Sequence, residues 1–409
     1  MNPFTYRLTE QLHTLSCQGR QRNLLALQPK GATHLTYQNR EYLNLASNDY
    51  LGLAGNQDLL RKFYSNLEQK QNIYQYRLGS GASRLMTGNH IQYNKLERGL
   101  ARYYHKDRAL IFTSGYHINI GLLPALAQKG DLILADKLCH ASLLDGMRLS
   151  QAKMIRYPHL NYDRLEQLLR KHSSGLTAQK KQTIFVVTES LFSMDGDYAD
   201  LSILVRLKEQ YGAVLYVDEA HAVGVRGSNG LGLAEEQGVV GQIDLLVGTF
   251  GKAWGGQGAF VVCEETIYIY LVNTARSLIF TTALPPVNIH WLNFILPLIP
   301  KMNRERQQLH TLTQQLCHDL QEQELTISGN SQNTQNSHII PVMIGNEEQA
   351  VAVAKQVQQQ GFWVQAIRTP TVPRGTARLR LSLTAALQAK QLTALPKHIA
   401  RAIRQGRLS

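Results

Sequence analysis

Cysteine is scarce in this chain of 409 residues, and its scarcity argues against several kinds of site. The four cysteines, Cys17, Cys139, Cys263 and Cys317, stand far apart, and no C-x-x-C pair occurs. Zinc sites and redox pairs use such pairs, and small disulfide-built domains need more cysteines at closer spacings. We therefore expect no metal site, no disulfide framework and a reducing, cytoplasmic environment.

Long hydrophobic runs are also missing. The most apolar stretch, "IHWLNFILPLIP" at residues 289–300, is too short to span a bilayer and contains two prolines. The opening "MNPFTYRLTEQLHTL" has no apolar segment of the kind found in signal peptides. We expect residues 289–300 to form a buried helix, and we expect no membrane partner.

Concentrated basic charge is absent too, although the net charge is +13, because the lysines and arginines are scattered. The letters "DEAH" at residues 218–221 also occur in helicases, but helicases need the phosphate loop G-x-x-x-x-G-K-[ST]. Around the only Gly-Lys pair, Leu246 replaces the first glycine and Ala253 replaces the hydroxyl residue. We expect no nucleic acid, and the positive surplus fits an anionic substrate or an acidic carrier protein.

Short apolar runs alternating with amphipathic helical stretches are abundant between about residues 55 and 290. Such alternation predicts an α/β fold with a mainly parallel sheet covered by helices on both faces. Ligands of such sheets bind beyond the carboxyl ends of the strands. The predicted strands are residues 108–114, 132–137, 183–190, 213–221, 243–250 and 258–265.

Three regions are predicted along the chain. Residues 1–45 form an N-terminal segment with a helix and short strands, and residues 46–290 form a large domain. Residues 291–409 form a smaller α+β domain. A long helical stretch at 287–320 leads into the small domain, and Pro297 and Pro300 should kink or split it.

Lys252 stands in the glycine-rich stretch "GTFGKAWGGQG", directly after a predicted strand. With the phosphate loop excluded, we expect this lysine to hold pyridoxal 5'-phosphate through a Schiff base, since burial lowers a lysine pKa and makes the amine nucleophilic. The cofactor ring needs a carboxylate at its pyridine nitrogen, a partner for its hydroxyl and a flat group stacked on it. Asp218 and His221 stand at the end of one predicted strand and His140 follows another, and the three suit these tasks in that order.

The cofactor phosphate needs backbone N–H groups at a helix start together with hydroxyls. Gly115 and Tyr116 stand where a predicted strand turns into a helix, and Thr249 precedes the lysine by three residues. We expect these three residues to bind the phosphate.

The order of these motifs resembles that of the α-oxoamine synthases, which are fold-type I pyridoxal-phosphate enzymes. The similarity covers nearly the whole chain and includes "GSGASRLMTGNHIQYNKLE", "HASLLDG", "TESLFSMDGDYADL", "VDEAHAVGVRGSNGLG", "TFGKAWGGQGA" and "FTTALPP". The resemblance implies a seven-stranded, mainly parallel sheet in the large domain. It also implies that Lys252, Asp218, His221 and His140 are the catalytic residues.

Further residue roles rest on the resemblance alone. Ser193 would contact the cofactor, and Thr281 and Thr282 would reach the phosphate in the neighbouring subunit of an obligate homodimer. Arg380 would pair with the amino-acid carboxylate, whereas Arg22 and Thr371 would contact the acyl substrate. On charge alone, Arg380 and the other arginines of "ARLRLSL" would be a solvated strand face.

The segment "AIRTPTVPRGTARLRLSLTAAL" is most similar to the family branch that condenses L-alanine with a pimeloyl thioester during biotin biosynthesis. The acyl carrier would be CoA or an acyl carrier protein, and the products would be 8-amino-7-oxononanoate, CO₂ and free thiol. Thr369 and Leu387 depart from the usual pattern of that branch, and these departures concern acyl-chain selectivity. Sister enzymes such as glycine C-acetyltransferase are the alternative.

Overall fold

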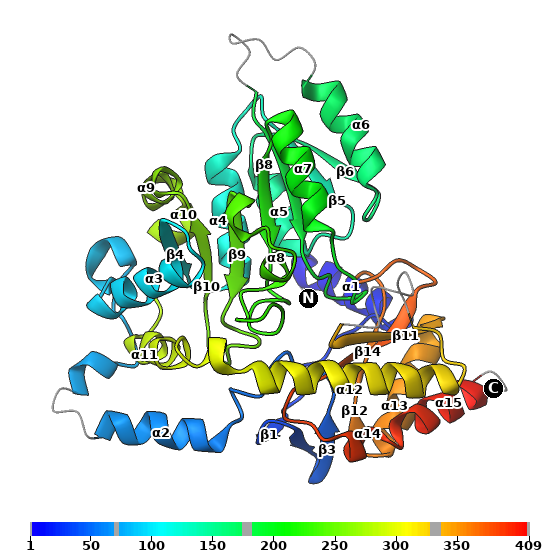
Figure 1. Cartoon of the computed structure of the whole chain (residues 1–409). Coiled ribbons are helices and arrows are strands. Elements are labelled where there is room, and N and C mark those ends of the chain that lie inside the picture. Colours follow the sequence, from blue (N-terminus) through cyan, green and yellow to red (C-terminus); the bar gives the residue numbers. More distant parts are fainter. Residues whose placement is uncertain (1, 69–72, 174–181, 328–336, 407–409) are drawn as a thin grey trace.

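The computed structural model describes residues 2–68, 73–173, 182–327 and 337–406, and its centre is a seven-stranded sheet (Figure 1). The strand order is β4-β10-β9-β8-β7-β5-β6. Only β10 (Ala259–Cys263) runs against its neighbours, so the prediction of a mainly parallel sheet is confirmed. The other strands are β4 (Arg108–Phe112), β5 (Leu132–Asp136), β6 (Lys153–Tyr157), β7 (Ile184–Glu189), β8 (Val214–Asp218) and β9 (Leu245–Thr249).

Helices cover both faces of this sheet because its strands are apolar on both sides. Leu132–Asp136 and Ile184–Glu189 are buried at every position, as expected for central parallel strands. One face packs against α4 (Gly115–Leu126), α5 (Ala141–Leu149), α9 (Glu265–Thr274) and α10 (Arg276–Ile279). The other face packs against α3 (Ile91–Tyr103), α6 (Tyr162–Ser173) and α7 (Leu201–Tyr211), and the short α8 (Leu233–Glu236) and η3 (Val240–Gln242) precede β9.

The predicted helix at 287–320 is split, as its prolines require. The first part, α11 (Pro286–Ile295), ends before Pro297, and the single turn η4 (Ile299–Lys301) contains Pro300. The second part, α12 (Asn303–Glu322), crosses the molecule below the central sheet (Figure 1).

The C-terminal part contains a three-stranded sheet in the order β11-β14-β13. Its central strand β14 (Ala377–Ser382) is buried at all six positions, arginines included, so the solvated strand face suggested by charge is wrong. The remaining elements are β11 (Ile339–Gly345), α13 (Glu347–Gln359), β13 (Gln365–Ile367), α14 (Ala389–Leu392) and α15 (Leu395–Gly406).

The N-terminal segment is joined to the C-terminal part by strand pairing. Its last strand, β3 (Arg40–Asn44), pairs in parallel with β12 (Phe362–Trp363) in a sheet of order β1-β2-β3-β12. The division of the chain at residues 45 and 290 stays a prediction. The other elements of this region are α1 (Pro3–Cys17), β1 (Gln28–Lys30), β2 (His34–Tyr37), α2 (Gln57–Glu68), η1 (Ile73–Tyr76) and η2 (Arg84–Gly88).

Within the described ranges, no helix combines the length and the apolar character that crossing a membrane requires.

Candidate active site

A cavity of about 240 Å³ lies beyond the carboxyl ends of the central strands, where parallel sheets place their ligands. Seven of the residues predicted from the sequence line it, and they come from segments up to 137 positions apart. They are Gly115, Tyr116, His140, Asp218, His221, Thr249 and Lys252. Asn48, Asn119, Ser142 and Glu189 also line the cavity, and sequence reasoning missed these four.

Lys252 follows β9 and lines the cavity. The Nζ atom lies 2.8 Å from Nε2 of His221. Desolvation lowers the pKa of Lys252 to about 8, although the negative charges of Asp218 and Glu189 act in the opposite direction. A substantial fraction of this amine is therefore neutral and nucleophilic near physiological pH.

The hydrogen bonds of His221 fix how protons are placed around the lysine. Burial, followed by the nearby Lys252 charge, holds the pKa of His221 well below its usual value, so the ring is neutral. When the ammonium of Lys252 donates to Nε2, the proton of the ring must be on Nδ1, which lies 2.6 Å from the Tyr50 hydroxyl. Tyr50 in turn donates to Asn48 Oδ1 at 3.0 Å. Because Nδ1 carries the ring proton, Nε2 of His221 is the hydrogen-bond acceptor that faces the cavity.

Asp218 ends β8, and its carboxylate is buried at the base of the cavity. Asn119 Nδ2 donates to one carboxylate oxygen at 2.9 Å, and the backbone N–H of Ala220 donates to the other at 2.9 Å. Tyr216 orients Asn119 by donating to its Oδ1 at 2.5 Å. Because these donors are neutral, the negative charge stays available to a positively charged ring nitrogen.

His140 is the N-cap residue of α5 and lines the cavity near Ser142. Its Nδ1 lies 2.8 Å from the Ser142 hydroxyl, and its backbone N–H donates to Glu189 Oε1 at 2.5 Å. Desolvation and the Lys252 charge lower the pKa of His140, although Asp218 acts in the opposite direction, so its ring is neutral and suited to stacking on a flat group.

Glu189 is a buried carboxyl beside two other charged groups. Burial and then repulsion from Asp218 hold its pKa well above the usual range. Glu189 ends an apolar strand run, as Asp218 does, so a search for polar residues at strand ends could have found it. Asn48 and Asn119 gave no comparable signal in the sequence.

The start of α4 lines the cavity and suits a phosphate group. Gly115 and Tyr116 are its first residues, and the first N–H groups of a helix have no partner within the helix. The Thr249 hydroxyl donates to the Gly258 carbonyl at 3.0 Å and accepts from the Gly251 N–H at 3.2 Å. Tyr116 contributes its backbone here, because its hydroxyl donates to Asp145 instead.

Arg380 lies beside the cavity rather than in its wall. Its guanidinium is buried and reaches Asn48 Oδ1 at 3.3 Å and the Tyr50 hydroxyl at 3.4 Å. Its Nε donates to the Ser193 carbonyl at 2.5 Å, whereas Ser193 does not line the cavity, and its contact with the cofactor stays a prediction. Asn48, which lines the cavity, is therefore the residue through which Arg380 contacts the cavity wall.

Four other predicted residues lie away from the cavity of this chain. Arg22 donates to the Thr371 hydroxyl at 3.3 Å, so the two predicted acyl contacts meet at the surface. Thr281 and Thr282 follow α10, and Thr282 forms an isolated bridge with Ser83. The structure of a single chain does not bring these two threonines to the cavity.

This donor set fits pyridoxal phosphate. The cavity is lined by an amine that can bond to the cofactor aldehyde and by a buried carboxylate that can pair with the ring nitrogen. It is also lined by a neutral histidine that can stack on the ring and by a helix N-terminus that can bind the phosphate.

Comparisons with known proteins agree with this chemistry. Residues 40–399 match the family "Aminotransferase class I and II". The chain is 48% identical to 8-amino-7-oxononanoate synthase of Haemophilus ducreyi over 94% of its length and 98% of that protein. Its fold is similar to that of serine palmitoyltransferase from S. paucimobilis, solved with a bound PLP–myriocin aldimine, with TM-score 0.87, 28% identity and 98% of both chains covered.

A solved 8-amino-7-oxononanoate synthase from Francisella tularensis has a similar fold, with TM-score 0.73, 27% identity and coverage of 90% of this chain and 99% of that one. The fold-type I architecture predicted from the sequence is confirmed by these neighbours. The chain belongs to the pyridoxal-phosphate-dependent 8-amino-7-oxononanoate synthases, within the class I and II aminotransferase family.

Proposed function

We propose that this protein condenses L-alanine with a pimeloyl thioester and releases CO₂, free thiol and 8-amino-7-oxononanoate. The observation that carries the proposal is the part-buried Lys252 amine, whose pKa is lowered to about 8 and which lines one cavity together with Asp218 and His221. The high identity to named 8-amino-7-oxononanoate synthases supports the choice of this reaction within the family.

Each of the seven predicted residues that line the cavity has a task in this proposal. Pyridoxal phosphate, when bound, supplies an electron sink for the carbon from which a proton is removed. Lys252 would hold the cofactor, and its free amine would remove the α-proton of alanine. Asp218 keeps the ring nitrogen protonated, His221 binds the ring hydroxyl and His140 stacks on the ring. Gly115, Tyr116 and Thr249 hold the phosphate.

The amino-acid carboxylate would bind the Arg380 guanidinium next to Asn48. Asn48 lines the cavity and accepts from Arg380 at 3.3 Å, and a planar guanidinium suits a carboxylate. Arg22 and Thr371 form a second, exposed pair that could receive the distal part of the acyl chain.

A substrate panel tests this function. Thiol release should occur with L-alanine and pimeloyl-CoA and should be at least about tenfold slower with glycine or L-serine, or with acetyl- or palmitoyl-CoA, because a few kcal/mol separate such substrates. Release confined to glycine and acetyl-CoA would move the protein to the sister enzyme glycine C-acetyltransferase. Pimeloyl-acyl carrier protein is the second donor to test.

We also propose a cytoplasmic homodimer whose partner subunits share the active sites. Large apolar side chains are exposed together on segments that contact one another through the Ser83–Thr282 bridge and the Ala82–Ala283 hydrogen bond. Such a group marks a protein interface. Its members are Ile73, Tyr74, Leu78, Leu85, Met86, Ile91 and Phe280.

Phe280 is 71% exposed and directly precedes Thr281, which we expect to reach the phosphate site of the partner. Phe280→Asp should raise the dimer dissociation constant at least about 30-fold, as loss of a central aromatic residue does. Cofactor affinity should fall in parallel. Sedimentation and cofactor titration measure both effects. Leu149→Asp, at an exposed position outside this group, is the matched control and should change neither.

A further inference from the structure

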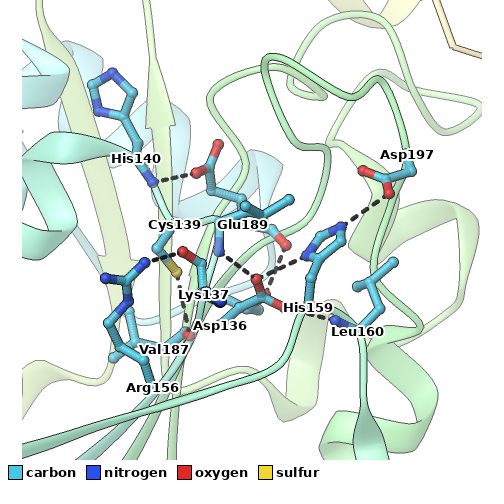
Figure 2. A network of polar contacts seen from close by, with 12 residues as sticks. Asp136, Lys137, Cys139, His140, Arg156, His159, Leu160, Val187, Glu189 and Asp197 are labelled. Atoms are coloured by element: carbon cyan, nitrogen blue, oxygen red, sulfur yellow. Dashed lines mark hydrogen bonds and ion pairs between the residues drawn. The ribbon is translucent and has the colours of Figure 1, made fainter. Parts of the chain in front are cut away.

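His159 lies between two buried carboxylates outside the cofactor cavity (Figure 2). Its Nδ1 is 2.8 Å from Asp136 Oδ1, and its Nε2 is 2.9 Å from Asp197 Oδ2. The Asp136 side chain is 0% exposed and that of Asp197 is 8% exposed. Both ring nitrogens therefore act as donors, which requires the charged imidazolium.

The charge state of His159 follows from these partners. Desolvation lowers its pKa, but the hydrogen bonds and charges of Asp136 and Asp197 raise it to about 10. The ring is therefore a cation at neutral pH.

One arm of this bridge organises the turn that carries His140. Asp136 ends β5 and accepts hydrogen bonds from the backbone N–H groups of Leu138 at 2.8 Å and Leu160 at 2.9 Å. The turn continues to His140, whose backbone N–H is held by Glu189 (Figure 2). The direction in which this turn leaves the sheet therefore depends on Asp136.

The other arm holds the loop that carries Ser193. The backbone carbonyl of Asp197 accepts from the backbone N–H of Phe192 at 2.9 Å, and the Phe192 ring packs edge-on against the His159 ring with 4.4 Å between the ring centroids. The residues between them present the Ser193 carbonyl to Arg380 at 2.5 Å and the Asp195 carboxylate to Arg378 at 2.5 Å.

We propose that His159 is a positioning residue, which spans Asp136 and Asp197 and so keeps the turn that carries His140 and the loop that carries Ser193 at a fixed distance from each other. The inference rests on the proposed function for the tasks of His140 and Arg380. It assigns a role in the reaction to a residue that touches neither substrate nor cofactor. Displacing a catalytic group by about 1 Å costs about 10²-fold in rate, so a loosened bridge should be visible in turnover.

Two conservative variants each keep one of the two His159 contacts and remove the other. In His159→Asn the amide nitrogen takes the place of Nδ1 and keeps the Asp136 contact, whereas in His159→Gln it takes the place of Nε2 and keeps the Asp197 contact. Both variants, as holoenzymes, should lose at least half of the visible circular dichroism of the bound cofactor, because that signal reports ring orientation. Their kcat should fall about 10- to 100-fold.

Lys208→Gln is the matched control. It breaks the 2.7 Å ion pair with Asp244 at the other end of the same sheet, where the pair is 18% and 25% exposed. This variant should lower the unfolding temperature as the His159 variants do, while the dichroism and kcat stay unchanged. If either His159 variant keeps the wild-type dichroism and kcat, or changes only the unfolding temperature as Lys208→Gln does, the proposal is overturned.

The pH dependence of unfolding gives a second measurement. Because the pKa of His159 is raised in the folded state, its stabilising contribution is complete below about pH 6.5 and is lost as pH rises toward 10. The groups that face it are Asp136 and Asp197, and the Tyr162 phenol interacts with the same two carboxylates. The gap in unfolding temperature between wild type and both variants should shrink over this range, and a constant gap would contradict the charged bridge.

The circular dichroism of the cofactor is measured without an acyl substrate. It therefore tests the positioning role of His159 independently of the proposed function. A wild-type protein with normal cofactor dichroism that makes no product from alanine would refute the proposed function alone.

Discussion

Lys252→Ala should abolish turnover and the visible absorbance of a lysine-bound cofactor. The substitution removes both the amine that holds the cofactor and the base that takes the α-proton. Proton transfer alone contributes about 10²–10⁴-fold, so the residual rate should fall below a thousandth of the wild-type rate. Steady-state thiol release and absorbance spectra measure both effects.

Lys106→Ala is the control for this experiment. Lys106 is another partly buried lysine, but its ammonium donates to the Gly241 and Ile243 carbonyls near the opposite end of the sheet. This variant should keep full activity. A Lys252→Ala rate within tenfold of wild type would remove the lysine from the mechanism.

Asp218→Asn should lower kcat by about 10- to 1,000-fold while the protein still binds the cofactor. The change keeps the shape and the contact with Ala220 but removes the negative charge, and an opposite charge shifts the pKa of its partner by about 1–3 units. The cofactor ring nitrogen would lose its proton and draw electrons less strongly. The rate with L-alanine and the pH at which the cofactor spectrum changes measure this loss.

Asp244→Asn makes the same chemical change at the other end of the sheet. Asp244 accepts hydrogen bonds from Lys208 and from the Leu215 N–H, both at 2.7 Å, and is far from the carboxyl ends of the strands. Its loss should affect stability and leave kcat unchanged. Equal kcat losses in both variants would mean that the Asp218 charge has no special place in the reaction.

Much of the central sheet could be predicted because its inner strands are continuous apolar runs. The exception is β6, whose sequence "KMIRY" is only partly buried and sits at the edge of the sheet. Because polar residues interrupt the apolar pattern of this strand, the sequence predicts neither β6 nor the turn after it that carries His159. Edge strands lack the two-sided burial that makes inner strands recognisable.

The site residues could be predicted where reactive side chains stand at or just after a strand end, as for Asp218, His221 and Lys252. It could not be predicted where contacts join distant segments. Asn119 lies inside a helix, and only the fold brings its amide to Asp218 across 99 positions. Arg378 and Arg380 look solvated in the sequence, because their partners Asp195 and Ser193 are more than 180 residues away.

The central claim, a decarboxylative condensation, is tested most directly with L-alanine labelled at its carboxyl carbon. With pimeloyl-CoA or the pimeloyl carrier protein, the protein should release one labelled CO₂ for each free thiol, and neither product when the acyl donor is omitted. Thiol release without labelled CO₂, or labelled CO₂ without the acyl donor, would contradict the account.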